Sequence, residues 1–218
     1  HMEDLKFHIV RHVPVINPNR IWYGDEIEID LLSDAVKARF NELAALLPNP
    51  QIAKIYSSPY ARAHITAAGF LEAARPTIKP EIIIEPGFQE QQYGLMTNQP
   101  HELIKDMPHV VAYMSDMWAT APEKGESLGM FYKRISGAFE KAIKETGNGT
   151  RDIIIFCHGG VQMASASMVT GIRMDELMKE RRTRKELDFS YMSVLTVTYK
   201  RESREWSKSL TTNPGIHL

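Results

Sequence analysis

The sequence predicts an α/β protein, folded as a three-layer α/β/α sandwich around a mostly parallel central sheet. Short strand-like runs, including residues 7–10 and 153–156, alternate with segments whose apolar residues recur at helical spacing. Residues 153–156 are apolar at every position, which is typical of a strand buried on both faces of a parallel sheet. Alternating strands and helices favour one sheet with helices on both faces.

The composition is that of a globular protein with one large domain, which we assign to residues 2–218. The chain has 218 residues, of which 43% are hydrophobic, and its formal net charge is −1. This balance gives no reason to expect a nucleic-acid or membrane partner. No run reaches transmembrane length, no basic-then-apolar signal peptide is present, and Cys157 is the single cysteine. We therefore expect a cytoplasmic protein without an internal disulfide.

The first predicted strand begins near Phe7 and ends in Arg11 and His12. The prolines of the next segment lack the amide donor that a central strand needs, so the chain leaves the sheet directly after His12. Residues 13–30 then form a long polar loop. Long structured loops are often functional, so this loop is a candidate part of a site.

A helix is expected from Ser33, a suitable N-cap, to about Leu47, where two nearby prolines end it. Residues 52–56 form the second strand. Ser58 is the expected N-cap of the next helix, because the proline that follows it suits the first helical position.

The middle of the chain contains a short strand at residues 82–84 and a mixed segment at residues 97–122. We expect that segment to be an insertion with one helix, covering one end of the sheet. Apolar residues between Phe131 and Ile143 recur at helical spacing, and the Gly-Asn-Gly sequence at residues 147–149 closes that helix.

The last third of the chain returns to the sheet. The apolar strand at residues 153–156 runs into Cys157-His158-Gly159-Gly160, after which a helix extends to Gly171. The segment 187–200 closes the domain, with strand-forming residues at positions 194–199.

Two predicted strands therefore end in a histidine, His12 and His158. The carboxyl ends of parallel strands meet at one edge of a sheet, where open α/β sheets bind their ligands. Arg11 lies beside His12, and Arg62 lies in the first turn of a helix whose N-terminus faces the same edge. Guanidinium groups and a helix N-terminus suit a doubly charged oxyanion such as a phosphoryl group.

A carboxylate is also expected at this edge. Glu90 follows the third strand and can reach the two histidines, although Glu85 is close in sequence and is the alternative. Burial would raise the pKa of such a carboxyl and the nearby cations would lower it, which suits a group that both donates and accepts a proton.

These motifs resemble those of the histidine phosphatase superfamily, which is phosphoglycerate mutase-like. Arg11-His12 stands where that family has its Arg-His-Gly signature, and His158-Gly159-Gly160 matches its second His-Gly-Gly. The other matching blocks are residues 57–67 (Ser-Ser-Pro, then Arg-Ala and Thr-Ala), 90–94 (Glu and Gly), 125–127 (Gly-Glu-Ser) and 213–218 (Asn, then His-Leu). The blocks occur in the family's order and span nearly the whole chain.

The resemblance implies a metal-independent phosphomonoester hydrolase that acts on a small phosphorylated metabolite, without a cofactor. In this interpretation His12 is the nucleophile and forms a phosphohistidine. Arg11, Arg62 and His158 bind the phosphoryl oxygens, with guanidinium and imidazolium groups supplying the positive charge. Glu90 protonates the leaving oxygen and later takes a proton from water.

The resemblance also suggests substrate-binding residues, which are Asn17, Arg20, Tyr23, Ser57 and Gly159. Asn19 is an alternative to Asn17 as the asparagine that contacts the phosphate.

Three departures from the family pattern affect the prediction. Val13 replaces the usual small residue after the nucleophile, and residues 95–98 replace the usual Trp-Glu-Gly-like sequence. The spacing from Arg11 to the loop asparagine is also not the common one. We expect the insertion at residues 97–122 to cover the active site. The methionines of this region could form an adaptable apolar wall for the substrate; they are Met96, Met107, Met114 and Met117.

Other functions stay open at this point. A phosphoglycerate-type mutase returns the phosphoryl group to its substrate, although such mutases tend to be longer than this chain. A catalytically weak member would bind phosphorylated ligands or partner proteins, and Val13 keeps that alternative open. The basic run at residues 179–185 is interpreted as a solvated helix end rather than an anion-binding patch. A homodimer is possible, as it is common among relatives.

Overall fold

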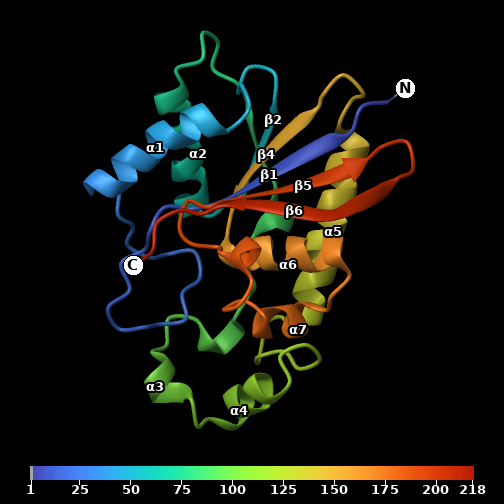
Figure 1. The fold of residues 1–218 in the computed structure, drawn as a ribbon. Coiled ribbons are helices and arrows are strands. Elements are labelled where there is room, and N and C mark those ends of the chain that lie inside the picture. The colour runs from blue at the N-terminus through green and yellow to red at the C-terminus, as the bar shows by residue number, and fades with distance from the viewer. Residues whose placement is uncertain (1) are drawn as a thin grey trace.

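The computed structural model describes residues 2–218, which share one six-stranded sheet with the order β3-β2-β4-β1-β5-β6 (Figure 1). Strands β1, β2, β3 and β4 run parallel to one another, whereas β5 is antiparallel to both of its neighbours, β1 and β6. The strand bounds are β1 Leu5–Arg11, β2 Lys54–Ser57, β3 Ile82–Ile84, β4 Asp152–Cys157, β5 Val194–Lys200 and β6 Glu205–Asn213. The predicted mixed, mostly parallel sheet is confirmed.

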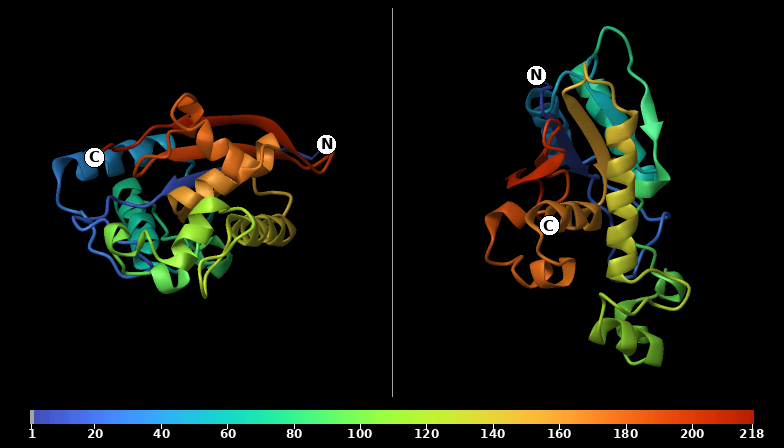
Figure 2. Two further views of the ribbon diagram at one scale, coloured as in Figure 1. Left: turned by 90° about the horizontal axis from the view of Figure 1, so that it is seen from below. Right: turned by 90° about the vertical axis from the view of Figure 1, so that its right-hand side faces the viewer.

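Helices pack on both faces of this sheet. The α-helices are α1 Asp34–Leu46, α2 Ala61–Ala74, α3 His101–Ile104, α4 Pro108–Ser115, α5 Leu128–Glu145, α6 Gly159–Thr170 and α7 Met174–Lys179. One core cluster lies between the sheet and α1 with α2, and a larger one lies between the sheet and α5 with α6. The right-hand view of Figure 2 shows α5 alongside the sheet and α3 and α4 beyond the lower end of α5. The three-layer α/β/α arrangement is therefore as predicted.

The central strand β4 shows why its sequence is apolar throughout. Ile154 and Phe156 point into the core beneath α1 and α2, whereas Ile153 and Ile155 point into the core beneath α5 and α6. All four side chains are fully buried. Because successive side chains of a strand alternate between the two faces, a strand covered on both faces has no position for a polar residue.

The start of α2 differs from the prediction. Tyr60, not Ser58, is the N-cap, and the helix begins at Ala61. The Ser58 amide donates to the Phe156 carbonyl at 2.9 Å, so the chain is still attached to β4 at the position where a cap was expected. The Ser58 hydroxyl instead contacts His158, as described below.

The insertion at residues 97–122 holds two short helices, α3 and α4, rather than one. Pro108 begins α4 at its first position. A proline has no amide hydrogen and restricts the residue before it, so α3 cannot continue into α4. The insertion has a small core of its own, made of Met96, Ile104, Val110 and Tyr113.

The C-terminal region contains elements that the sequence did not reveal. The strand-forming residues 194–199 form β5 as expected, and β6 adds a second antiparallel strand that the sequence did not reveal. Every residue of β6 is exposed or half-buried, and its sequence lacks the apolar alternation that marks a strand. Helix α5 ends at Glu145 with Thr146 as its C-cap, directly before the predicted Gly-Asn-Gly stop. Within residues 2–218, no helix has the length and apolar character needed to cross a membrane.

Candidate active site

The two histidines that end strands lie side by side. β1 and β4 pair in parallel with Arg11 opposite Cys157, and the His12 amide donates to the Cys157 carbonyl at 3.0 Å. This register brings His12 and His158 to the same edge of the sheet, where their ring centroids are 5.3 Å apart. Both side chains are buried, with exposed fractions of 2% and 0%.

The hydrogen bonds of His12 define which ring nitrogen is available for chemistry. Nδ1 lies 2.7 Å from the Val13 carbonyl oxygen, so it carries the proton and donates it. Nε2 accepts from Arg62 Nε at 3.3 Å and therefore carries a lone pair. Burial, together with the charges of Arg11 and Arg62, holds the pKa of His12 well below its usual range. The ring is a neutral imidazole with its lone pair directed into the site.

Arg62 lies in the first turn of α2 and is 1% exposed. Its guanidinium lies between the rings of Tyr23 and Tyr60, 4.9 and 5.0 Å from their centroids. Nη1 donates to the carbonyl oxygens of Gly24 and Asp25, which fixes the planar group against the loop that follows β1. Arg62 is thus oriented by stacking and by backbone oxygens rather than by a carboxylate.

Arg11 is held on the other side of the histidine pair. Its Nη1 donates to the Phe189 carbonyl at 2.7 Å, and its guanidinium carbon lies 4.1 Å from the ring centroid of Tyr191. The ring of Tyr191 is also 5.9 Å from that of His12. Phe189 and Tyr191 come from the segment before β5, and the sequence analysis did not identify either as part of the site.

His158 is connected to Ser58 rather than to a carboxylate. Its Nε2 lies 2.8 Å from Ser58 Oγ, and Ser58 Oγ also accepts from the Tyr60 amide at 3.3 Å. A hydroxyl that accepts at its oxygen can donate its own hydrogen to Nε2, which leaves the ring proton on Nδ1. Burial and the charge of Arg62 hold the pKa of His158 well below its usual range. A neutral His158 ring can donate from Nδ1, whereas the sequence interpretation has an imidazolium supply positive charge at this site.

Each of the three expected phosphate ligands keeps one buried nitrogen without a hydrogen-bond partner among residues 2–218. These nitrogens are Arg11 Nε, Arg62 Nη2 and His158 Nδ1. Buried donors of this kind are rare in folded proteins because an unmade hydrogen bond costs about 1–3 kcal/mol. Three of them on adjacent side chains, beside a nucleophilic nitrogen, form a set of donors suited to an oxyanion.

Glu90 reaches the same edge, as expected. Its Oε2 accepts from the Gly160 amide at 3.0 Å and its Oε1 accepts from the Gln91 amide at 2.9 Å. A Cβ on Gly160 would lie 2.1 Å from Oε1, so only glycine allows this contact. The alternative, Glu85, caps the turn at residues 86–88 and pairs with Lys141, away from the histidines.

A half-buried arginine, Arg134, which sequence reasoning missed, holds the Glu90 loop. Arg134 Nη1 donates to the carbonyl oxygens of Gly87 and Gln89, and Nη2 donates to that of Glu90 at 3.1 Å. Arg134 also makes a two-point contact with Glu126, at 2.9 and 2.8 Å. Glu126 belongs to the Gly-Glu-Ser block, so that motif supports the candidate acid without touching the histidines.

The loop at residues 13–30 and the insertion are joined beside the site. Trp22 makes a bridge with Thr97, and Ile21 makes one with Pro100. The Trp22 ring packs against Tyr93 at 5.0 Å. These contacts hold Tyr23 over Arg62, so Tyr23 lies at the site as the sequence suggested.

The remaining predicted substrate-binding residues lie at varied positions. The side chain of Asn17 exchanges two hydrogen bonds of 3.0 Å with the backbone of Ile21 and so closes its own loop. Arg20 is exposed, and its carbonyl accepts from the His101 amide. Ser57 Oγ donates to the Ser58 carbonyl at 2.8 Å. Gly159 begins α6, where an added Cβ would lie 3.2 Å from Arg11 Nε.

Val13 does not crowd the site. Its side chain is fully buried in the core cluster beneath α1 and α2. Its carbonyl accepts from His12, and its amide donates to Thr66 Oγ1 at 3.0 Å. A larger residue than glycine is tolerated because the side chain points away from the two histidines.

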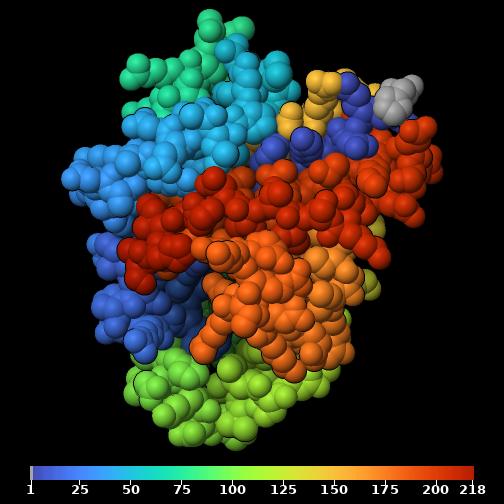
Figure 3. Space-filling model, viewed as in Figure 1, coloured from blue at the N-terminus to red at the C-terminus, as the bar shows by residue number. Residues whose placement is uncertain are grey.

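A pocket of about 240 Å³ opens from this edge between Arg11, Glu90 and helix α7. Figure 3 shows a hollow on the corresponding face, between the blue loop after β1 and the orange segment after α7. The methionines that line the pocket are Met163, Met174 and Met178. The insertion methionines expected there do not line it, since Met96 is buried in the insertion's own core and Met107 and Met114 are exposed.

The basic run at residues 179–185 is only partly a solvated helix end. Arg184 pairs with Glu180 and Glu186. Arg181, in contrast, lines the pocket, where burial and the charge of Arg11 lower its pKa. The sequence analysis did not place Arg181 near the site.

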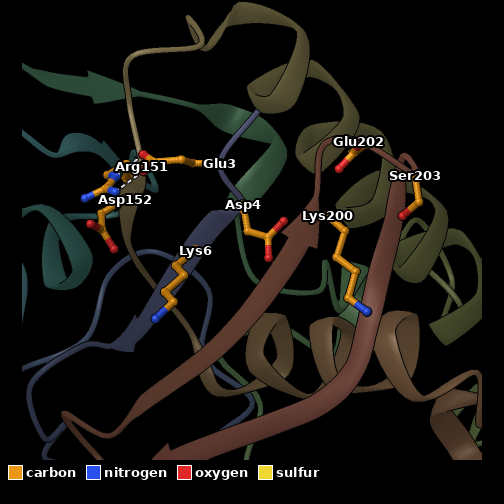
Figure 4. A pocket seen from close by; sticks show the side chains of 8 residues that line it. All are labelled: Glu3, Asp4, Lys6, Arg151, Asp152, Lys200, Glu202 and Ser203. Atoms are coloured by element: carbon orange, nitrogen blue, oxygen red, sulfur yellow. Dashed lines mark hydrogen bonds and ion pairs between the residues drawn. The ribbon is translucent and has the colours of Figure 1, made fainter. Parts of the chain in front are cut away.

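A larger hollow, of about 800 Å³, lies at the opposite ends of β1 and β4 (Figure 4). Its lining contains four acidic and three basic side chains, among them the ion pair of Glu3 and Arg151. Charges of both signs are mixed there, and His12 is at the far end of β1. In the part of the chain that the structure describes, no group of three His, Cys, Asp or Glu side chains could hold a metal ion.

Comparison with known proteins identifies the family. The model of the histidine phosphatase superfamily (branch 1) matches residues 7–208. The chain belongs to this superfamily. The matched range includes all five residues that form the edge described above, His12, Arg11, Arg62, Glu90 and His158. None of the curated protein sequences compared with the chain matches it.

Solved structures of similar fold include phosphatases and a mutase. The alpha-ribazole phosphatase from Shigella flexneri is 16% identical with a TM-score of 0.75, over 98% of this chain and 99% of that one. The mycobacterial glucosyl-3-phosphoglycerate phosphatase is 17% identical with a TM-score of 0.69, over 97% and 100%. The phosphoglycerate mutase from Bacillus anthracis is 18% identical with a TM-score of 0.69, over 94% and 92%. At these identities the similarity establishes the phosphoglycerate mutase-like fold.

Proposed function

We propose that this protein is a phosphomonoester hydrolase that acts on a small phosphorylated metabolite through a phosphohistidine at His12, without a metal ion. The observation that carries the proposal is the group of buried, unpartnered nitrogens on Arg11, Arg62 and His158, gathered around the lone pair of His12 Nε2 within residues 2–218. Membership of the histidine phosphatase superfamily supports it.

In the first step His12 Nε2 attacks phosphorus in line with the leaving oxygen. The N–P bond forms as the P–O bond breaks, and the Nδ1 proton stays on the hydrogen bond to the Val13 carbonyl. Arg62 Nε now contacts Nε2, so it must exchange that contact for a phosphoryl oxygen when the substrate binds. The low pKa of His12 keeps the nucleophile unprotonated at neutral pH.

Charge on the phosphoryl oxygens is met by groups that are already in place. Arg11 and Arg62 supply two guanidinium charges, and His158 Nδ1 supplies a neutral donor. Donors fixed by stacking and by backbone oxygens need little rearrangement during the reaction. Such preorganised donors are the main source of transition-state stabilisation in phosphoryl transfer. These guanidinium charges do the work that a metal ion does in other phosphatases.

Glu90 is the group that handles protons. In its acid form it donates a proton to the leaving alcohol, and the resulting carboxylate then takes a proton from the attacking water. That water breaks the N–P bond, releases inorganic phosphate and restores neutral His12. Two backbone amides hold the Glu90 carboxyl in one place for both proton transfers.

The test is phosphate release from p-nitrophenyl phosphate between pH 5 and 8 with a chelator present, for the wild type and His12→Ala. We expect turnover by the wild type and none above background by the variant. The phosphoenzyme should be trapped by an alkaline quench and lost in acid, as a phosphoramidate is. Full activity of His12→Ala, or loss of wild-type activity with the chelator, would overturn the proposal. Return of the phosphoryl group to substrate without phosphate release would instead indicate a mutase.

A further inference from the structure

Arg181 follows helix α7 at the junction of two adjoining hollows. The inner hollow is the pocket of about 240 Å³ that Arg11 and Glu90 also line. The outer hollow, of about 570 Å³, is formed mainly by the segment that follows α7. Arg181 and Phe189 line both hollows. The guanidinium of Arg181 therefore lies where the candidate active site opens toward the outer surface.

No carboxylate neutralises the charge of Arg181. Among residues 2–218 its side chain forms no ion pair and no hydrogen bond. Asp188 acts on Arg181 electrostatically, but both of its carboxylate oxygens contact His217 Nε2, at 3.0 and 2.9 Å. Burial, together with the positive charge of Arg11, lowers the pKa of Arg181. The inner pocket thus places two guanidinium groups beside one carboxylate, that of Glu90.

The hydrogen-bonding groups that the inner pocket leaves free include two donors besides Arg181. Tyr23 and Tyr93 line the pocket, and neither hydroxyl forms a hydrogen bond within residues 2–218. Burial raises the pKa of both hydroxyls, so each keeps its proton at neutral pH. Gln91 also lines the pocket, but its amide nitrogen already donates twice within the protein. Two hydroxyls and a guanidinium suit a ligand group that only accepts hydrogen bonds, as an oxyanion does.

The position of the inner pocket decides which part of a substrate reaches Arg181. Glu90 lines the pocket, whereas the two histidines of the site do not. An acid that protonates the leaving oxygen must lie within hydrogen-bond reach of it. The leaving alcohol therefore extends from Glu90 toward the segment after α7, which borders the hollow in Figure 3. Since Arg11 serves the phosphoryl oxygens, Arg181 is the cation of this pocket that has no anion assigned to it.

We propose that Arg181 is a specificity-determining residue and that the leaving alcohol of the substrate carries an anionic group, which Arg181 binds. The inference rests on the proposed function, because it assigns the leaving alcohol to the side of Glu90. The planar guanidinium can donate two parallel hydrogen bonds to a carboxylate or to a phosphoryl group. These two groups share the required chemistry, and the experiment separates them.

The test compares esters of primary alcohols that differ in charge at the far end of the alcohol. The carboxylate is 4-phosphooxybutanoate, its neutral counterpart of the same size is 4-phosphooxybutanamide, and the second phosphoryl group is supplied by butane-1,4-diol bisphosphate. The shorter pair, 3-phosphooxypropanoate and its amide, is measured beside them because chain length sets the reach from Glu90 to Arg181.

Arg181→Gln is the informative variant, because it removes the guanidinium charge and keeps a polar side chain. Arg182→Gln is the matched control. Arg182 is the next residue, is exposed like Arg181, and lines the outer hollow but not the inner pocket. Both variants lose one positive charge from the same segment, so a difference between them reports on contact with the substrate rather than on net charge.

We expect the wild type to have a kcat/KM at least about tenfold higher for a carboxylate or the bisphosphate than for the amide, and the better of the two anions identifies the group. Arg181→Gln should lower kcat/KM for that anionic ester about tenfold, mainly through KM, and leave the amide unchanged. Arg182→Gln should keep the preference of the wild type.

Three results would overturn the inference while leaving the proposed function intact. The first is a wild type that hydrolyses the amides as well as it does every anionic ester. The second is a loss in Arg181→Gln that is equal for the anionic ester and the amide, since that would indicate a structural role. The third is a preference that survives Arg181→Gln. In contrast, hydrolysis of none of these esters, or activity that survives His12→Ala, would mean that the proposed function itself is wrong.

Discussion

The Gly160 amide donates a hydrogen bond of 3.0 Å to Glu90 Oε2, and a Cβ at Gly160 would lie only 2.1 Å from Glu90 Oε1. The backbone of the first turn of α6 therefore contacts Glu90, the candidate acid, at a distance that only a glycine at position 160 allows. The same turn follows His158, so one short sequence, His158-Gly159-Gly160, places a phosphate ligand and fixes the proton donor. This relationship leads to the first prediction.

Gly160→Ala should displace the Glu90 carboxylate and lower kcat. A misplacement of about 1 Å in a reacting group can cost about 100-fold in rate, so we expect a fall of about 10- to 100-fold with little change in KM. Steady-state kinetics on benzyl phosphate measures it. Gly137→Ala in α5 is the control, because an added Cβ there meets nothing within 4 Å among the described residues. A normal kcat for Gly160→Ala would show that Glu90 is not held by this contact.

Arg134→Gln should reduce the catalytic contribution of Glu90 without touching the histidines. Arg134 binds the carbonyl oxygens of three residues of the Glu90 loop, so its loss lets that loop relax. For an alkyl phosphate we expect kcat/KM to fall about tenfold or more. For p-nitrophenyl phosphate the fall should be small, because its leaving group needs little protonation.

Arg201→Gln is the matched control for that prediction. Arg201 also binds three backbone carbonyls, those of Glu3, Gly147 and Asn148, but far from the site. Equal losses on both esters in Arg134→Gln, or the same pattern in Arg201→Gln, would indicate general destabilisation instead of a positioning role.

Ser58→Ala should lower activity more than Ser57→Ala. Ser58 Oγ contacts His158 Nε2 at 2.8 Å, so its removal frees the ring to rotate and to change its tautomer. Ser57 Oγ binds only a neighbouring carbonyl. We expect kcat/KM to fall about tenfold for Ser58→Ala, as for other residues that orient a ligand-binding histidine, and to fall much less for Ser57→Ala. A larger loss in kcat/KM for Ser57→Ala than for Ser58→Ala would instead support Ser57 as a substrate-binding residue.

Stability should fall as the pH drops below about 6.5. Burial lowers the pKa of His12, His158 and His8 in the folded protein below the usual histidine value of about 6.5. Above pH 6.5 these rings are neutral in both the folded and the unfolded chain, so they do not reduce the free energy of unfolding. Below it the unfolded chain binds protons that the folded one does not, which destabilises the fold by up to about 1.4 kcal/mol per pH unit for each ring.

Urea unfolding at pH 5, 6, 7 and 8 measures this dependence. His158→Gln should make the free energy of unfolding less dependent on pH, because it removes one of the rings that bind a proton only in the unfolded chain. His64→Gln, at an exposed position of α2, should leave the pH dependence unchanged. A stability that is constant from pH 8 to pH 5 would contradict the prediction.

The sequence was informative wherever a local pattern controls the structure. The apolar runs of β1 and β4 predicted the sheet, and the residues after each strand predicted that His12 and His158 meet at one edge. Arg62 and Glu90 followed from the same reasoning, since the ends of parallel strands share one edge. The structure brings these side chains together as the sequence led us to expect.

Contacts between distant segments were beyond the reach of such patterns. Ser58 and His158 are 100 residues apart, and nothing local distinguishes Ser58 from an ordinary N-cap. The loop of Asn17 is long enough for its amide to bind either phosphate or backbone, and the folded loop binds backbone. Arg134 looks like any exposed helix residue until the Glu90 loop packs against it.

By itself the sequence determined the fold class and the chemical type of each group at the sheet edge, because hydrophobic periodicity and strand ends are local properties. Only the tertiary structure decided which tautomer His12 adopts, what holds Glu90 and His158, and which methionines line the pocket. Those outcomes depend on the packing of α5, α6 and α7 against the sheet, where a shift of one ångström makes or breaks a hydrogen bond. The chain encodes that packing, but no short stretch of it displays the result.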